Sequence, residues 1–273
     1  MSSSPDNFHA LQVSAVIDET HDSKSFVFEI PAELRETFQY EAGQFLTFLV
    51  DYGGKNLSRS YSLASSPATD NAHKVTIKRV EQGRISNWFN DNVKAGDTLQ
   101  VTAPSGRFVL KDHSSPLWLF GGGSGITPMI SILKTALLKT SRIIQLVYAN
   151  RDEQSIIFDE ELKSLQANHA DRLKIIHNLD NRDGYLTPER IRNWLPIDHS
   201  GDYYLCGPTP FMDVIENTLK EMGIGREQIF LERFVSPADP DTPKEATSET
   251  EQDSVPEVFT VKWEDKMHQV PYE

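Results

Sequence analysis

The sequence from Leu117 to Pro128 is LWLFGGGSGITP, and this stretch is the most informative one for predicting the fold. Four apolar residues lead into packed glycines, and apolar residues at helical spacing follow from Met129. This order predicts a strand, a tight turn and a helix over 128–139 that uses Pro128 as its first residue. The first turn of such a helix presents unpaired backbone N–H groups at its positive end. The stretch therefore predicts a place that can hold a pyrophosphate.

The glycine run has no single meaning when it is taken alone. Ile126 stands where the dinucleotide motif G-x-G-x-x-G needs its third glycine, and it also breaks the G-x-S-x-G spacing around Ser124. No Lys-Ser or Lys-Thr pair follows, so the run is not a P-loop. A tight turn that uses glycine for positive φ angles explains the same residues. A function therefore needs a second, independent signal.

The chain changes rhythm near residue 114. Residues 8–113 contain short alternating segments, which predict an antiparallel β-barrel. In residues 114–235 strands and helices alternate, which predicts a parallel sheet between helices, with ligands at the carboxyl ends of its strands. The expected barrel elements are strands 25–30, 45–50 and 73–80 and a short helix at 85–90; the later strands are 117–120, 142–148, 172–178, 202–206 and 228–231, with helices 128–139, 158–168, 187–195 and 209–222.

The C-terminal part of the chain has a different composition. Residues 236–257 hold seven acidic residues and one basic residue and no aromatic residue, so we expect a flexible acidic linker. Residues 258–263 and 267–272 then read as one hairpin. An isolated hairpin is marginal in water, so 258–273 is expected to be the stub of a further domain.

Composition excludes several classes of function. The 27 basic and 40 acidic side chains give a net charge of −13, which argues against nucleic acid or an anionic membrane as partner. No apolar run approaches the ~20 residues that span a bilayer, and the N-terminus does not resemble a signal peptide. Cys206 is the only cysteine, so we expect a cytoplasmic protein without a disulfide. The histidines show no ligand spacing, so no metal site is expected.

The second signal is the segment Arg59-Ser60-Tyr61-Ser62 at the end of a barrel strand. A flavin dinucleotide needs a fixed cation for its pyrophosphate, a flat aromatic side chain against its ring and a hydrogen-bonding group beside N5. Arg59, Tyr61 and Ser62 can supply these groups within one short strand, because alternate residues share a face. An exposed arginine and a half-buried tyrosine on a strand edge are the alternative interpretation.

The order of four motifs resembles the ferredoxin–NADP reductase superfamily over residues 8 to 234. The motifs are Arg-x-Tyr-Ser at 59–62, the segment 78–88 around Gly83 and Ser86, the glycine run at 121–125, and Cys206-Gly207-Pro208. Within the superfamily, the segments 148–151 and 231–235 are similar to the reductase components of multicomponent oxygenases, the group that serves ketosteroid 9α-hydroxylases and phenylacetyl-CoA epoxidases. The resemblance implies FAD in the barrel domain and NAD(P)H on the α/β domain.

For FAD, the resemblance implies that Arg59 binds the pyrophosphate. Tyr61 would lie against the isoalloxazine and Ser62 near N5, with Ser60 between them in the motif. For Lys78 and Arg79 a solvated strand face is the alternative. The other residues implied around the ribityl and pyrophosphate groups are Lys78, Arg79, Val80 and the helix start at Gly83, Arg84, Ile85 and Ser86.

For the nicotinamide nucleotide, the resemblance places Cys206 where nicotinamide C4 approaches flavin N5. Glu232 is implied near the flavin edge, so Ser62, Cys206 and Glu232 are the candidate catalytic residues. Cys206 needs no thiolate for this role, because a small, soft side chain is enough. The alternative interpretation, a buried cysteine at the end of a strand, differs little from it in chemical terms. Arg151 could hold the adenosine ribose or its phosphate, or make a surface salt bridge. The other implied contacts are Gly122, Gly123, Thr127, Gly207 and Phe234.

The chain departs from its subgroup at the C-terminus. The relatives end in a ferredoxin domain whose [2Fe–2S] cluster needs four cysteines, and this sequence has one. We expect either that the ferredoxin domain is truncated, which is favoured, or that FAD passes electrons to a separate carrier. The expected route is NAD(P)H to FAD to an iron–sulfur centre, either a separate ferredoxin or one serving a partner oxygenase.

Two other functions stay open. A stand-alone NAD(P)H flavin or quinone reductase would need no protein partner, and a non-catalytic flavin-binding subunit would relay electrons within a complex. The choice of nucleotide is also open. Arg151 is the only cation after Tyr148 that could meet a 2′-phosphate, which favours NADH slightly.

Overall fold

A computed structural model describes residues 7–234 together with the strands at 258–263 and 266–271. The two strands β12 (Val258–Trp263) and β13 (Lys266–Pro271) pair antiparallel from Val258 opposite Pro271 to Trp263 opposite Lys266. This hairpin belongs to a unit separate from residues 1–237. The expected linker at 236–257 lies outside the described residues, and the role of the hairpin in a further domain stays a prediction.

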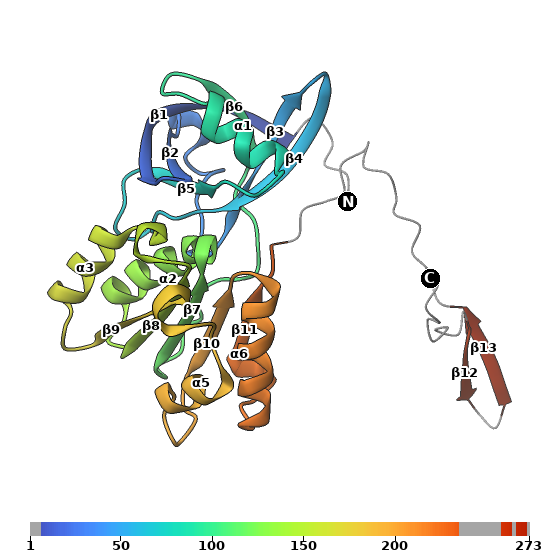
Figure 1. Ribbon diagram of the computed structural model, residues 1–273. Coiled ribbons are helices and arrows are strands. Elements are labelled where there is room, and N and C mark those ends of the chain that lie inside the picture. The colour runs from blue at the N-terminus through green and yellow to red at the C-terminus, as the bar shows by residue number, and fades with distance from the viewer. Residues whose placement is uncertain (1–6, 235–257, 264–265, 272–273) are drawn as a thin grey trace. The chain divides into compact units, whose positions relative to one another are not determined.

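The first half of the chain forms a curled antiparallel sheet, called here the barrel lobe (Figure 1). Its strand order is β4-β3-β6-β1-β2-β5, and a bridge between Leu63 and Val75 links the two edges. Side chains at alternate positions of β3, such as Leu46, Phe48 and Val50, point inward, and Phe89 of α1 covers this core. The elements are β1 (Phe8–Thr20), β2 (Ser23–Glu29), β3 (Phe45–Tyr52), β4 (Lys55–Ser62), β5 (His73–Lys78), α1 (Arg84–Asn92) and β6 (Thr98–Thr102).

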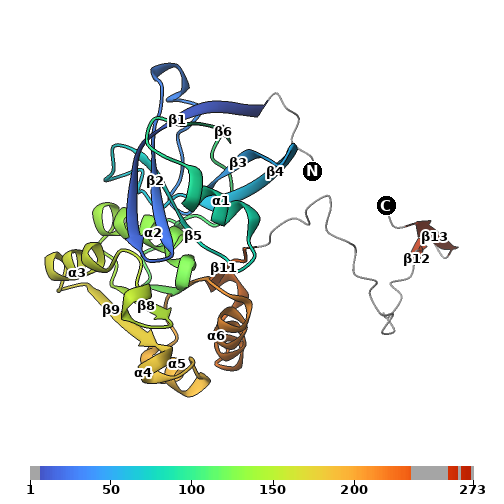
Figure 2. The same cartoon turned by 45° about the horizontal axis from the view of Figure 1, so that its top comes forward.

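The second half, called here the sheet lobe, is a parallel sheet with helices on both faces (Figures 1 and 2). Its strand order is β11-β10-β7-β8-β9. Alternate residues of β7 enter different cores: Leu117 and Leu119 pack beneath α2 and α3, whereas Trp118 and Phe120 pack beneath α5 and α6. The elements are β7 (Leu117–Gly122), α2 (Ile126–Lys139), β8 (Ile144–Asn150), α3 (Asp159–Asn168), β9 (Leu173–Leu179), α4 (Asp180–Asp183), α5 (Pro188–Trp194), β10 (Asp202–Cys206), α6 (Thr209–Glu221) and β11 (Ile229–Glu232).

The predicted fold class, an antiparallel barrel-like sheet followed by a parallel α/β sheet, is confirmed. Two local expectations differ from the structure. Helix α2 begins at Ile126, after the short turn η3 (Gly123–Gly125), so Pro128 is its third residue and not its first. Proline is tolerated there because the first-turn N–H groups have no partner within the helix. The four-residue helix α4 was not predicted, because it is too short to show a periodic pattern.

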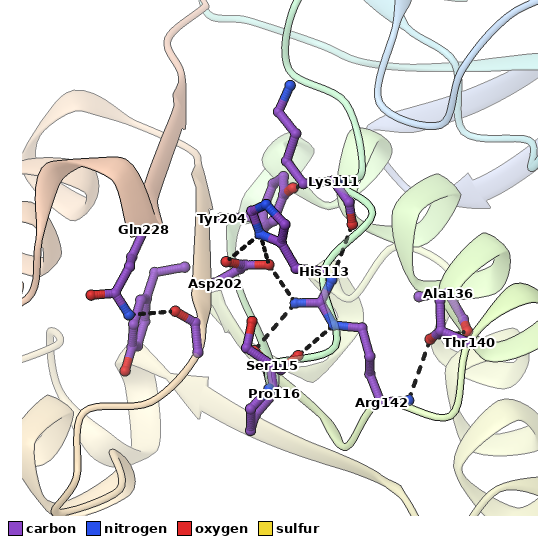
Figure 3. Close-up of polar contacts among 12 residues, drawn as sticks. Lys111, His113, Ser115, Pro116, Ala136, Thr140, Arg142, Asp202, Tyr204 and Gln228 are labelled. Atoms are coloured by element: carbon purple, nitrogen blue, oxygen red, sulfur yellow. Dashed lines mark hydrogen bonds and ion pairs between the residues drawn. The ribbon is translucent and has the colours of Figure 1, made fainter.

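A buried arginine anchors the segment that joins the two lobes (Figure 3). The Arg142 side chain donates from Nε to the Ser115 carbonyl and from Nη2 to the Asp202 carboxylate, at 2.5 and 2.6 Å. The Tyr204 hydroxyl donates to the carbonyl of Val109 and accepts from the Lys111 N–H group. These bonds hold the connection against the amino-terminal edge of the parallel sheet, so its opposite, carboxyl edge keeps a defined position relative to the barrel lobe.

A second set of polar contacts joins the lobes along α2. The Ser131 hydroxyl donates to the Ser65 carbonyl at 2.6 Å. Lys134 of α2 is nearly buried, and its ammonium group lies 2.7 Å from both Asp70 of the barrel lobe and Glu161 of α3. Burial opposes the charge of Lys134, but its hydrogen bonds to both carboxylates raise its pKa. The two lobes therefore pack as one unit.

Candidate functional site

The candidate site lies where the carboxyl edge of the parallel sheet meets the barrel lobe. The turn η3, which follows β7, lies against β5. Ala64, two residues beyond β4, belongs to the same hydrophobic core as Ile126 and Met129 of α2. The end of β4 and the glycine run are thus neighbours in space, although more than fifty residues separate them in the sequence. The two independent sequence signals therefore meet at the contact between the two lobes, called here the seam.

Arg59 and Tyr61 share the inner face of β4. Their strand partners on β3 are Phe48 for Arg59 and Leu46 for Tyr61, both fully buried. The Tyr61 ring makes an edge contact with the Phe89 ring at 5.6 Å, which fixes its plane. Burial raises the pKa of the Tyr61 hydroxyl above its ordinary value, against the influence of Arg59. A neutral aromatic ring and a cation therefore stand side by side on this face.

Ser60 and Ser62 lie on the opposite face of β4. The Ser60 hydroxyl is exposed and pairs with the Thr47 hydroxyl at 2.9 Å. A ligand on the Tyr61 face could meet only the backbone of Ser60. Ser62 ends the strand and is buried opposite Phe45. It lies near the seam because the strand ends there, although its side chain is on the other face from Tyr61.

Lys78 ends β5, Arg79 follows it, and both are held by carboxylates. Lys78 Nζ lies 3.6 Å from Asp22, and Arg79 Nη2 lies 2.5 Å from Asp91 of α1. Burial lowers the pKa of Lys78, and the neighbouring Asp22 opposes this effect. Lys78 is therefore not a simple solvated strand residue, whereas Arg79 pairs with Asp91 at the surface. Val80 follows with an exposed side chain, and its N–H group donates to the Ser86 hydroxyl.

The start of α1 forms a tight cradle around Gly83. A Cβ at Gly83 would lie 2.5 Å from Ser86 Oγ and 2.9 Å from Val80 Cβ, so a side chain does not fit there. No side chain among the described residues caps this helix, and its first turn carries no acidic residue. Ile85 is buried and anchors the turn, whereas Arg84 is half-exposed beside it. The cradle combines a positive helix end with bare backbone, which suits a pyrophosphate.

The glycines of the sheet lobe let the chain pack closely where β7 and β10 end side by side. A Cβ at Gly207 would lie 2.7 Å from the Phe211 ring and 3.0 Å from Gly122 Cα, and a Cβ at Gly122 would lie 2.9 Å from the same ring. A Cβ at Gly125 would lie 2.1 Å from the Cys206 carbonyl oxygen. The chain winds away from β7 in both directions, so this crevice is the topological switch point where α/β sheets bind ligands.

Tyr148 and Thr127 hold the glycine turn in place. The buried Tyr148 hydroxyl donates to the Gly123 carbonyl at 3.1 Å and accepts from the Ile157 N–H group. Gly123 has a φ of +52°, which favours glycine. Thr127 is buried and donates to the Ser124 carbonyl at 3.0 Å. As in α1, no described side chain caps α2, and its first turn lacks acidic residues.

Cys206 and Glu232 end the adjacent strands β10 and β11 in register. Cys206 is fully buried, and burial, with Glu232 adding to it, raises the pKa of the thiol well above its ordinary value. Burial also raises the pKa of the Glu232 carboxyl group. The thiol is therefore neutral, which is compatible with a role that needs no thiolate. Phe234 is about half exposed at the end of the described segment.

Arg151 makes a salt bridge. It follows β8, and its Nη2 lies 2.9 Å from an oxygen of Asp22 in the turn between β1 and β2 of the barrel lobe. This pairing is the alternative that the sequence left open for Arg151. Sequence reasoning missed Asp22, whose turn carries no motif. It also missed Phe211, which lines both glycines and stands four residues after Gly207, a spacing that could have drawn attention to it.

The fold and the crevice define a two-domain oxidoreductase that binds FAD and a nicotinamide nucleotide. Two family models match the chain: an oxidoreductase FAD-binding domain over residues 10–110 and an oxidoreductase NAD-binding domain over residues 119–217. In the part of the chain that the structure describes, none of the helices has the length and apolar character needed to cross a lipid bilayer.

The comparisons with individual proteins agree. The ferredoxin reductase component of 3-ketosteroid-9-alpha-monooxygenase from Rhodococcus rhodochrous is 43% identical over 93% of this chain and 76% of the relative. A component of the 1,2-phenylacetyl-CoA epoxidase from Escherichia coli K12 is 31% identical over 84% of this chain and 68% of the relative. The solved structure of a phthalate dioxygenase reductase superposes with a TM-score of 0.70 at 26% identity, over 86% of this chain and 70% of that chain.

The chain belongs to the ferredoxin–NADP reductase family of FAD- and NAD-binding oxidoreductases, and the Rhodococcus relative is the ferredoxin reductase component of a monooxygenase. The family expected from the motif order is confirmed, and so are the two cofactor-binding domains. The roles of individual site residues stay predictions.

Proposed function

We propose that the barrel lobe holds FAD between β4 and the start of α1. Arg59 would pair with the pyrophosphate, and Tyr61 would cover the isoalloxazine ring. Two observations support this placement. Arg59 and Tyr61 lie on one face of β4, and α1 starts after Gly83 with no acidic residue in its first turn and no room for a Cβ at that glycine. Lys78, Arg79, Val80 and the first turn of α1 (Arg84, Ile85, Ser86) would border the same group, with Ser60 meeting it through its backbone.

The nicotinamide nucleotide would occupy the crevice between the ends of β7 and β10. Gly122, Gly123 and Gly207 would let the nucleotide approach the protein backbone closely. Thr127 would hold the start of α2 toward the phosphates of the nucleotide. Cys206 would leave space beside the ring, with Ser62 and Glu232 at the flavin edge and Phe234 beside them. The switch point carries this proposal: β7 and β10 end side by side there, and the packing of Gly122 and Gly207 against Phe211 leaves no room for a Cβ at either position.

These residues bind and orient, and they need no nucleophile or general base. When bound, FAD supplies the chemistry by taking two electrons from the reduced nicotinamide and releasing them one at a time. The chain's part is to hold the two rings in contact, which the anchored turn at Tyr148 and the packed seam at Lys134 both favour. The neutral thiol of Cys206 is compatible with a role in shape alone.

We further propose that the electrons go to an iron–sulfur centre that serves an oxygenase. The solved relative is described as a modular structure for electron transfer from pyridine nucleotides to [2Fe–2S], and the Rhodococcus relative is a ferredoxin reductase component of a monooxygenase. This sequence has one cysteine, so its own residues cannot ligate such a cluster. The single cysteine also supports a cytoplasmic location.

We place the FAD domain at 8–113 and the nucleotide domain at 114–235.

Rapid mixing of the FAD-loaded protein with NADH, without oxygen, tests this function. We expect fast bleaching of the flavin, fast oxidation by a ferredoxin and slow turnover with free flavins or quinones. Fast turnover with those small acceptors would instead identify a stand-alone reductase. A flavin that binds but is not reduced by NADH or NADPH would identify an electron-relay subunit and contradict the proposal.

A further inference from the structure

Asp22 connects the candidate sites of the two lobes. It lies in the turn between β1 and β2, and its carboxylate is largely buried. The carboxylate meets Arg151 of the sheet lobe at 2.9 Å and Lys78 of the barrel lobe at 3.6 Å. Its backbone carbonyl accepts the Arg79 N–H group at 2.7 Å. One carboxylate therefore holds a cation from each side of the seam.

Arg151 occupies a position that decides nucleotide choice in parallel α/β sheets. It follows β8, the neighbour of β7 on the side away from the switch point. At the end of that strand an acidic side chain receives the ribose hydroxyls of NADH, whereas a nearby arginine accommodates the 2′-phosphate of NADPH. Here Arg151 is followed by Asp152 and Glu153. Arg151 is thus the one cation of the segment 148–153, and two acidic residues follow it directly.

We propose that Asp22 is a specificity-determining residue, which makes the nucleotide site select NADH over NADPH by occupying the guanidinium of Arg151. The inference rests on the proposed function, because it assumes that the nucleotide binds at the ends of β7 and β8. Asp22 belongs to the other lobe, so nucleotide choice is set across the seam and not within the nucleotide-binding sheet alone.

The charge balance favours this assignment. A 2′-phosphate carries about two negative charges and needs an available cation. Asp22 already takes a hydrogen bond from Arg151 and offsets its charge, so a phosphate that uses the remaining N–H groups would lie near the charges of Asp22, Asp152 and Glu153. The neutral ribose hydroxyls of NADH need no cation and can donate to a carboxylate. Lys78 is a weaker substitute, because it meets the same Asp22 oxygen as Arg151, at 3.6 Å, and burial lowers its pKa.

Binding of two nucleotide fragments tests the inference without any redox reaction. We would titrate 5′-ADP and 2′,5′-ADP into the full-length, FAD-loaded protein by calorimetry. The proteins are the wild type, Asp22→Asn, Arg151→Gln and the double variant. For Asp22→Asn we expect the affinity for 2′,5′-ADP to rise about tenfold, with that for 5′-ADP changed less than about twofold. In the double variant the gain should disappear, because the released guanidinium is gone.

Asp18→Asn is the matched control. Asp18 is an exposed carboxylate on β1, pairs with Lys24 at 3.6 Å and does not touch Arg151, so it changes the net charge equally. Flavin content and thermal unfolding of each variant show that the barrel lobe is intact, and Asp22→Ser provides a second removal of the charge.

An unchanged preference between the two fragments in both Asp22 variants would overturn the inference alone. So would a gain that persists in the double variant, or an equal gain in Asp18→Asn. Failure of the wild type to bind 5′-ADP would instead overturn the nucleotide site itself, and the inference with it.

Discussion

The two lobes build their candidate sites by opposite means. The barrel lobe offers what its side chains carry: the guanidinium of Arg59 and the ring of Tyr61 on one face of β4. The sheet lobe offers what its residues lack, since a Cβ at Gly122, Gly125 or Gly207 would collide with neighbouring atoms. The start of α1 is the exception within the candidate site of the barrel lobe, because it too depends on a glycine, Gly83, where a Cβ does not fit.

This difference follows from the two kinds of sheet. In an antiparallel strand, alternate side chains stand on the same face, so one segment can present a cation and a ring together. In a parallel sheet, the strand ends converge on one edge, so the ligand meets backbone and helix ends. The first site should therefore respond to the chemistry of a substitution and the second to its volume.

The largest effect is expected from Gly125→Ala. The new Cβ would lie 2.1 Å from the backbone oxygen of Cys206, which has no room to move between β7 and β11. We expect the free energy of unfolding to fall by about 3 kcal/mol, as in overpacked cores, with loss of reduction by NADH. Thermal or urea unfolding measures the loss of stability.

Gly123→Ala is the comparison for that measurement. No atom of the described chain lies within 4 Å of a Cβ there, and only its φ of +52° is unfavourable. The expected cost is about 1 kcal/mol. Equal losses for the two variants would show that backbone conformation, and not volume, governs the glycine turn.

A smaller effect, on cofactor retention rather than folding, is expected from Arg59→Ala. Loss of a charge-assisted contact to the pyrophosphate should weaken FAD binding by about 2 kcal/mol, or roughly thirtyfold. Arg59→Lys should restore part of it, because lysine keeps the charge but not the forked geometry. Fluorescence titration of the flavin-free protein measures the change.

Ser60→Ala is the control for Arg59, since its hydroxyl faces Thr47 on the opposite side of β4. Its affinity for FAD should match the wild type. If Ser60→Ala released FAD as readily as Arg59→Ala, the inner face of β4 would not be the flavin site.

The last effect, no larger than that of Arg59→Ala, is expected at the seam between the lobes, from Lys134→Met. Partly buried ion pairs lie between exposed and buried ones in strength, so we expect a loss of about 2 kcal/mol near pH 7. Burial opposes ionisation of Asp70, but hydrogen bonds from Lys134 and Ser66 lower its pKa below 3.8. A lowered carboxyl pKa stabilises the fold above pH 3.8, and the contribution is lost as the pH falls through the folded value.

The difference in stability between wild type and Lys134→Met should therefore shrink as the pH is lowered from about 5 toward about 3. Unfolding curves across this range provide the measurement. A difference that stays constant over the whole range would mean that packing of the lysine stem, and not its charge, joins the lobes.

Much of this architecture could be predicted from local patterns. Alternation predicted β2, β3 and β5 of the barrel lobe but gave no range for β1 or β6, whereas the β-α rhythm predicted all five strands of the parallel sheet within about two residues. The common face of Arg59 and Tyr61 followed from strand period alone and is confirmed by the register with Phe48 and Leu46. The start of α2 was wrong by two residues, because the turn η3 continues directly into the helix.

Local sequence was enough to establish the two kinds of sheet, the glycine turn and the cation beside an aromatic ring, because each depends on residues close together in the chain. Three-dimensional packing was needed to show that Phe211 fills the space beside Gly122 and Gly207. Packing also paired Arg151 with Asp22, 129 residues away. Such a contact leaves no periodic signal, because it depends on how two separately patterned lobes meet and not on either pattern.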